Sequence, residues 1–176
     1  CYKRILSAHD NKVAAHKILI YRARSLDHLI SQLFLKIEKQ VQKSSKKVEG
    51  QCVVLSQGGY GRQEMCLYSD IDLLFLYEQK NKSYVEAVVE GVLHVLWDLE
   101  LDVGHAARTV DDCLKVMFED LTILTSMIDV RFLAGDKEFF SKFHLKFKKQ
   151  ISKQANKKKF YKSKIEESKE RFKKYG

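Results

Sequence analysis

The chain has 176 residues, of which 45% are hydrophobic and 31% charged. This length and apolar content fit one domain with a sizeable core. No apolar run approaches the ~18 residues that a membrane span needs, and no secretory signal precedes the first helical pattern. The four cysteines lack C-x-x-C spacing, which favours free thiols in a reducing compartment over a disulfide framework or a zinc site. We therefore expect a cytoplasmic protein without a membrane partner.

The net charge of +9 belongs to the C-terminal end of the chain. Residues 137–176 hold 15 Lys and Arg against 4 Asp and Glu, whereas residues 1–136 hold 17 against 19. This concentration favours a solvated helix, or one packed on a further domain, over a nucleic-acid groove, and no nucleic-acid partner is expected. A nucleoside triphosphate or an acidic partner is the alternative use of the charge. Because the chain begins at Cys1 rather than Met, we expect a fragment of a longer multidomain protein.

Residues 13–40 are predicted to form a helix, because apolar residues recur at three- and four-residue steps. The opposite face is basic, and Arg22 and Arg24 are interpreted as surface charges rather than substrate ligands. A polar linker follows over 41–51. The next residues, Cys52–Leu55, are apolar and rich in β-branched side chains, which predicts a buried strand.

A glycine turn and a pair of acids come next. Gln57–Gly61 contains three glycines, which allow the backbone to approach a ligand closely. Asp70–Tyr77 is predicted to be a second strand, and its alternation places Asp70 and Asp72 on one face. Two neighbouring carboxylates repel each other and are costly to bury, and a divalent cation relieves that repulsion. Carboxylates beside a phosphate-binding glycine turn indicate a metal-nucleotide site.

The remaining elements alternate in type. Trp97 is interpreted as a core residue, and Leu101 and Val103 are expected to face away from Asp102. A capping-box-like start at Thr109 predicts the helix that follows it. The predicted elements are helix 84–99, strand 101–105, helix 110–118, helix 120–133 ending at Gly135, and one or two long helices over 137–175. This alternation indicates an α/β domain.

These residues also carry a resemblance. Gly58-Gly59, followed after a spacer by Ser69-Asp70-Ile71-Asp72-Leu73-Leu74, resembles the active-site signature of the DNA polymerase beta-like nucleotidyltransferase superfamily. The longer string GGYGRQEMCLYSDIDLLFLY resembles one branch, the bacterial protein-PII uridylyltransferases. Residues 96–109 and 120–136 resemble two later segments of the same branch. The chain departs from the branch at Gln63, where Gly is usual, and near Leu67, where Pro is usual.

The resemblance implies a small twisted mixed sheet flanked by helices, an α/β (α+β) nucleotidyltransferase fold with long N- and C-terminal helices. From the resemblance we expect residues 1–176 to form one catalytic domain. Its expected parts are an N-terminal helix and linker over 1–50, the catalytic sheet core over 51–109, and a helical C-terminal part over 110–176.

The implied chemistry is Mg²⁺-dependent transfer of UMP from UTP to a tyrosine hydroxyl of the PII nitrogen-signalling protein, with release of pyrophosphate. Asp70 and Asp72 would hold Mg²⁺. The superfamily places a third carboxylate on the following strand, and Asp102 fits that pattern for a two-ion site, although a simply exposed acid fits equally well. Gly58 and Gly59 would let backbone amides approach the phosphates. Weaker candidates for nucleotide binding are Arg62, Ser69 and Arg108, the last with a structural ion pair as its alternative.

Two other functions remain open from the sequence. One keeps the chemistry and changes the acceptor to another protein, a small molecule or a nucleic-acid end. The other is a non-catalytic regulatory or interaction domain with the same fold. Two unpaired acids on one strand face argue against the second, because a scaffold has no use for them.

Overall fold

The structure, a computed structural model, describes residues 7, 10–44, 51–117 and 119–175. In this part of the chain a four-stranded mixed sheet has the order β3-β2-β1-β4. β1 runs antiparallel to both β2 and β4, and β2 runs parallel to β3. The strands are β1 (Cys52–Ser56), β2 (Ile71–Tyr77), β3 (Val103–Thr109) and β4 (Arg131–Gly135). The predicted α/β class with a mixed sheet is confirmed.

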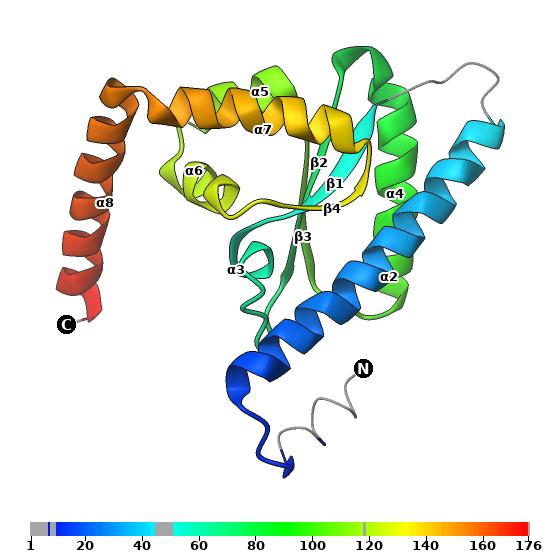
Figure 1. The fold of residues 1–176 in the computed structure, drawn as a ribbon, viewed down its shortest axis with the longest axis horizontal. Coiled ribbons are helices and arrows are strands. Elements are labelled where there is room, and N and C mark those ends of the chain that lie inside the picture. Colours follow the sequence, from blue (N-terminus) through cyan, green and yellow to red (C-terminus); the bar gives the residue numbers. More distant parts are fainter. Residues whose placement is uncertain (1–6, 8–9, 45–50, 118, 176) are drawn as a thin grey trace.

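Helices cover both faces of the sheet (Figure 1). The long N-terminal helix α2 and the crossover helix α4 lie on one face, and α5, α6 and α7 lie on the other. α8 continues the chain beyond α7, at the end of the molecule opposite α2. The helices are α2 (Ala15–Ser44), α3 (Gly58–Gly61), the 3₁₀ turn η1 (Gln79–Asn81), α4 (Lys82–Asp98), α5 (Val110–Val116), α6 (Leu121–Ile128), α7 (Lys137–Ser152) and α8 (Gln154–Tyr175).

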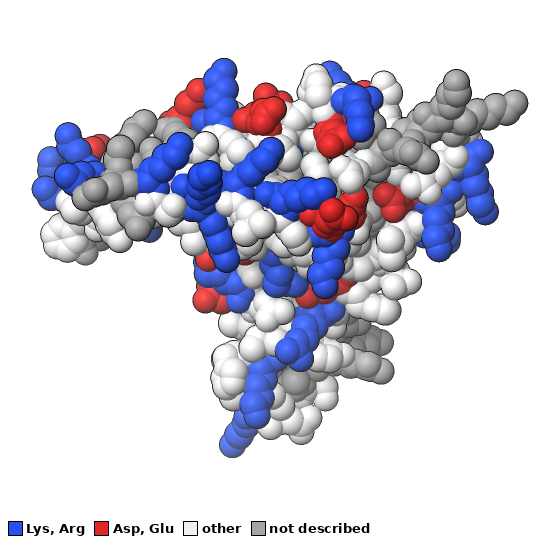
Figure 2. All heavy atoms as spheres, turned by 45° about the horizontal axis from the view of Figure 1, so that its top comes forward, with Lys and Arg blue, Asp and Glu red and all other residues white. Residues whose placement is uncertain are grey.

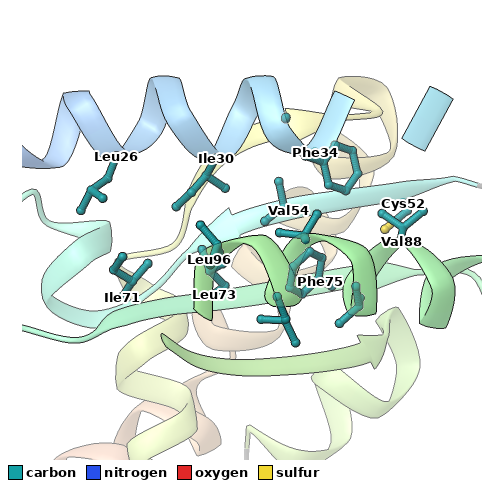
Figure 3. Packing of buried hydrophobic residues seen from close by; sticks show 14 of the residues in the cluster. Leu26, Ile30, Phe34, Cys52, Val54, Ile71, Leu73, Phe75, Val88 and Leu96 are labelled. Carbon is teal, nitrogen blue, oxygen red and sulfur yellow. The ribbon is translucent and has the colours of Figure 1, made fainter. Parts of the chain in front are cut away.

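Strand alternation divides the core into two clusters. Ile71, Leu73 and Phe75 of β2 point to the α2–α4 side, where the apolar stripe of α2 meets them (Figure 3). Leu74 and Leu76 point to the side of α5, α6 and α7. Because β1 and β2 are buried on both faces, their sequences are continuous apolar runs, which is why they were readable as strands. Asp72 shares a face with Leu74 and Leu76 but is exposed at the open end of the strand.

Three predictions, for residues 120–133, Trp97 and the linker over 41–51, differ from the structure. The helix expected over 120–133 ends at Ile128, and Arg131–Gly135 instead forms β4 beside β1. Trp97, expected in the core, has 49% of its surface exposed, because its ring lies beside His94 and His105 rather than in the buried cluster that its neighbour Leu96 joins. The 41–51 linker is shorter than predicted, since α2 continues to Ser44; residues 45–50 lie outside the described residues.

The basic C-terminal region lies on one side of the molecule. Figure 2 shows Lys and Arg side chains gathered over the side that carries α7 and α8. The exposed lysines of α7 include Lys142, Lys146, Lys148 and Lys149. Among the described residues, no helix combines the length and the apolarity that crossing a membrane requires.

Candidate active site

The candidate site lies where β2 and β3 begin. These two strands are parallel, with Ile71 opposite Val103 and Asp72 opposite Gly104. The Ile71 N–H donates to the carbonyl oxygen of Asp102 at 2.9 Å, so the pairing extends one residue before β3. Leu101 and Val103 pack against the α2–α4 cluster, as predicted. Alternation therefore places Asp102 on the same sheet face as the candidate carboxylates of β2.

Two glycines crowd the carboxylate of Asp72. A methyl group added at Gly104 would lie 2.7 Å from Asp72 Oδ1, and one added at Gly58 would lie 3.3 Å from Asp72 Oδ2. The residue as a whole is exposed, yet its carboxylate rests against these two backbones. This partial burial, together with the neighbouring charge of Asp70, raises the pKa of Asp72. A side chain at Gly104 would therefore require the Asp72 carboxylate to move, and one at Gly58 would press against it.

The three predicted carboxylates share an edge of the sheet. Asp70 immediately precedes β2 and Asp102 immediately precedes β3, and the parallel pairing sets them opposite each other. In the described part of the chain, no three His, Cys, Asp or Glu side chains converge to metal-binding distance. Like-charged carboxylates repel one another, so a shared edge does not by itself bring their oxygens together. Carboxylate oxygens are nonetheless the donors that suit Mg²⁺, and a cation would offset the repulsion that raises the Asp72 pKa.

The glycine turn is one short helical turn, α3, and it is tied to β2. The Gln57 N–H donates to the backbone carbonyl oxygen of Asp72 at 3.1 Å. α3 begins at Gly58, which has a φ of +54°. Because Gly58 and Gly59 are the first residues of the helix, their N–H groups have no acceptor inside it. Gln63, which follows the turn, has a φ of +62°. That left-handed conformation favours glycine, the residue that the resemblance led us to expect there.

The other predicted nucleotide ligands lie at different distances from the carboxylates. Arg62 follows the turn, but its guanidinium pairs with Glu64 at 2.6 Å and with Asp129 at 2.8 Å. Ser69 lies next to the carboxylates, and its N–H donates to the Cys66 carbonyl oxygen at 3.0 Å.

Arg108 lies four residues beyond Gly104 along β3, a distance of about 13 Å at the usual rise of a strand. It is close to Cys113: burial raises the pKa of the Cys113 thiol to about 11, and the charge of Arg108 partly offsets that effect. The structure therefore brings Ser69 and the turn to the carboxylates, and it leaves Arg108 at the far end of the strand.

Two residues beside the site, Arg22 and Asp27, were not predicted to belong to it. For Arg131 the sequence favoured a structural role over a substrate-orienting one. Arg22, interpreted as a surface charge, is partly buried; its Nη2 donates to the Ser69 carbonyl oxygen at 3.3 Å, and its Nη1 is buried without a hydrogen-bond partner. Burial lowers its pKa. Asp27 of α2 and Arg131 of β4 form an ion pair against the glycine turn. The spacing along α2 gave only a partial signal. Arg22 lies four residues before the apolar Leu26, and Asp27 lies four residues after Ala23, which places both beside the apolar face but does not say what they contact.

Part of the chain is similar to several curated proteins. No family model matches the chain. The chain is 42% identical over 123 residues to a bifunctional uridylyltransferase/uridylyl-removing enzyme of Ruegeria pomeroyi, covering 70% of the chain and 13% of the relative. It is 40% identical over 128 residues to the enzyme of the same name from Phenylobacterium zucineum, covering 72% and 14%. A Cereibacter sphaeroides relative of that name is 55% identical over 82 residues, covering 47% and 9%.

The chain is homologous to part of these bifunctional enzymes. It spans about one seventh of the length of the first two relatives. The resemblance to uridylyltransferases is therefore supported. The names of these relatives give both uridylyl transfer and uridylyl removal as activities of the whole enzymes.

Proposed function

We propose that the chain carries out Mg²⁺-dependent nucleotidyl transfer, moving UMP from UTP to a tyrosine hydroxyl of a PII-type signalling protein and releasing pyrophosphate. The observation that carries the proposal is the seating of Asp72. Its carboxylate lies between two side-chain-free backbones, 3.3 Å from the methyl position of Gly58 and 2.7 Å from that of Gly104. The relatives at 40–42% identity support uridylyl transfer as the reaction.

Asp70 and Asp72 would hold Mg²⁺, and Asp102, on the same edge, is the proposed third ligand. When bound, Mg²⁺ supplies charge neutralisation to the triphosphate and favours deprotonation of the acceptor hydroxyl. The N–H groups of Gly58 and Gly59 donate to phosphate oxygens, because α3 gives them no acceptor of their own.

The chemistry is an in-line displacement. The acceptor oxygen attacks the α-phosphorus, the bond from that phosphorus to the bridging oxygen of the β-phosphate breaks, and pyrophosphate leaves with both electrons. Positioning and charge stabilisation supply most of the catalysis in such reactions. The backbone hydrogen bond from Gln57 to Asp72 serves that purpose, since it fixes the phosphate-binding turn relative to the carboxylates.

The acceptor is tested with purified chain, Mg²⁺, UTP and a PII-type protein from the same source, followed by the intact mass of the acceptor. We expect one UMP per acceptor tyrosine, with no addition when that tyrosine is changed to Phe. ATP in place of UTP tests the base preference. The variant Asp72→Asn should abolish the addition, whereas Glu86→Gln, which neutralises an exposed acid near the start of α4, should leave it unchanged. UMP addition to the Phe acceptor, or full activity of Asp72→Asn, would contradict the proposal.

A further inference from the structure

Arg131, the first residue of β4, is wrapped around the glycine turn. Its Nε donates to the carbonyl oxygen of Gly61 at 3.3 Å, and its Nη2 donates to that of Tyr60 at 3.2 Å. The same guanidinium lies 5.6 Å from the centre of the Tyr60 ring, within the range of a cation–π contact. One side chain thus holds the C-terminal half of α3 through two backbone oxygens and one ring.

Asp27 of α2 fixes the orientation of that guanidinium. Its two carboxylate oxygens accept from Arg131 Nη1 at 2.6 Å and from Nη2 at 3.0 Å. A two-pronged pairing of this kind sets the plane of the guanidinium as well as its position. Asp27 and Arg131 are 104 residues apart in sequence, so the turn is held jointly by the N-terminal helix and by β4.

The turn has little freedom to move on this side. A methyl group at Gly61 would collide with the backbone carbonyl oxygen of Asp129, so the turn packs directly on the segment that leads into β4. At its other end, the Gln57 N–H is bound to the Asp72 carbonyl oxygen. The turn is therefore anchored at one end to β2 and at the other to Arg131. The N–H groups of Gly58 and Gly59 lie between the two anchors.

We propose that Asp27 and Arg131 are positioning residues, which orient the glycine turn for the nucleotide phosphates without touching the substrate. This inference rests on the proposed function for its catalytic meaning. The ion pair is largely buried, with 28% and 22% of the two side chains exposed. A buried pair is weak evidence for net stability, although removal of one partner alone is costly. Arg131 makes four donor contacts, two to Asp27 and two to carbonyl oxygens of the turn. These contacts indicate that the pair fixes the position of the turn.

The chain offers a matched control for this role. Ser31 of α2 donates from its hydroxyl to the Leu133 carbonyl oxygen of β4 at 2.9 Å. This contact joins the same two elements as the Asp27–Arg131 pair but does not touch α3. The test compares Arg131→Lys, which keeps the charge and loses the fork, and Asp27→Asn with the control Ser31→Ala. Thermal unfolding of each variant sets a temperature at which all are folded.

At that temperature we expect kcat/KM for UTP to fall about tenfold or more in Arg131→Lys and in Asp27→Asn, with the larger part in KM, because misplaced donors weaken phosphate binding. Ser31→Ala should stay within about twofold of the parent. The double variant Asp27→Asn/Arg131→Lys should lose no more kcat/KM than the worse single variant. The reason is that both residues act through one ion pair held against α3, which we call the clamp. Equal kinetics in all three single variants would overturn the proposal.

Amide hydrogen exchange separates this proposal from the proposed function. In both clamp variants the amides of Gly61 and Arg62, which donate to the carbonyl oxygens of Gln57 and Gly58, should exchange at least about tenfold faster relative to β1 than in Ser31→Ala. If the parent chain shows no transfer, the proposed function fails, and this exchange measurement alone decides whether the clamp exists. Exchange at Gly61 and Arg62 that matches the Ser31→Ala control would overturn the clamp whatever the activity.

Discussion

Gly104→Ala tests the seating of the candidate metal ligand. Its added methyl would lie 2.7 Å from Asp72 Oδ1, whereas ordinary contact begins at 3.4 Å, so the carboxylate must retreat by about 0.7 Å. The obstacle is the end of a flexible side chain at an exposed position, and a rotation of that side chain relieves it. Folding should therefore change by less than about 1 kcal/mol, the range of ordinary glycine-to-alanine effects. Catalysis should fall by about 10²-fold, because a misplacement approaching 1 Å at a reacting centre has that cost.

The assay for this variant pairs steady-state UMP transfer with urea unfolding. Ala107→Ser, on the same strand and exposed on the opposite face, is the matched control and should keep both activity and stability. A Gly104→Ala protein with unchanged kcat/KM would refute the argument that the Asp72 position matters. A protein that fails to fold would refute the argument that the side chain can rotate away.

Three further predictions concern charge, thiols and backbone. Asp72→Asn should stabilise the metal-free protein at pH 7. A carboxylate whose pKa is raised in the folded state loses folding free energy when it ionises, and this loss sets in as pH rises above 3.8. Urea unfolding in a chelator would contradict this prediction if the difference in free energy of unfolding between the variant and the parent did not widen with pH. Among the three cysteines in the described residues, Cys66 is exposed, whereas burial raises the pKa of Cys52 to about 12 and that of Cys113 to about 11. A thiol reagent should therefore label Cys66 before Cys52 and Cys113, which should react only on unfolding; mass mapping that finds Cys52 or Cys113 labelled in folded protein would argue otherwise. Gly135→Ala should lower the free energy of unfolding by about 2 kcal/mol or more, because Gly135 has a φ of +105° and a methyl there meets the Cys52 carbonyl oxygen; an unchanged urea midpoint would rule out that strain.

The parts of the fold that were predictable are those whose sequence carries its own signal. β1 and β2 are short apolar runs bounded by turn residues, and α4 repeats its apolar residues at helical spacing. β4 carried no such signal. Leu121, Leu124 and Ile128 recur at helical spacing, and neither Gly nor Pro interrupts the sequence before Gly135. Arg131–Gly135 becomes a strand through its pairing with β1, a long-range contact that overrides local preference.

Some residues of the candidate site were likewise predictable from the sequence, and others were not. Asp70, Asp72 and the glycines were found because they lie together in sequence and form a known pattern. Asp27 and Arg131 act as one unit but lie 104 residues apart, so no local pattern joins them. Arg22 was misjudged because a long polar side chain on a helix is usually solvated. Here its guanidinium donates to the Ser69 carbonyl oxygen, a contact that only the packing of α2 against the segment between α3 and β2 reveals.

The central claim is that the edge formed by β2 and β3 performs nucleotidyl transfer. The most direct measurement supplies UTP labelled at either the α- or the γ-phosphate, with Mg²⁺ and the PII-type acceptor. Nucleotidyl transfer predicts that the α-label enters the acceptor and that the γ-label leaves as pyrophosphate. A chelator or Asp70→Asn should abolish both. Appearance of the γ-label on the acceptor, or undiminished α-label transfer by Asp70→Asn, would contradict it.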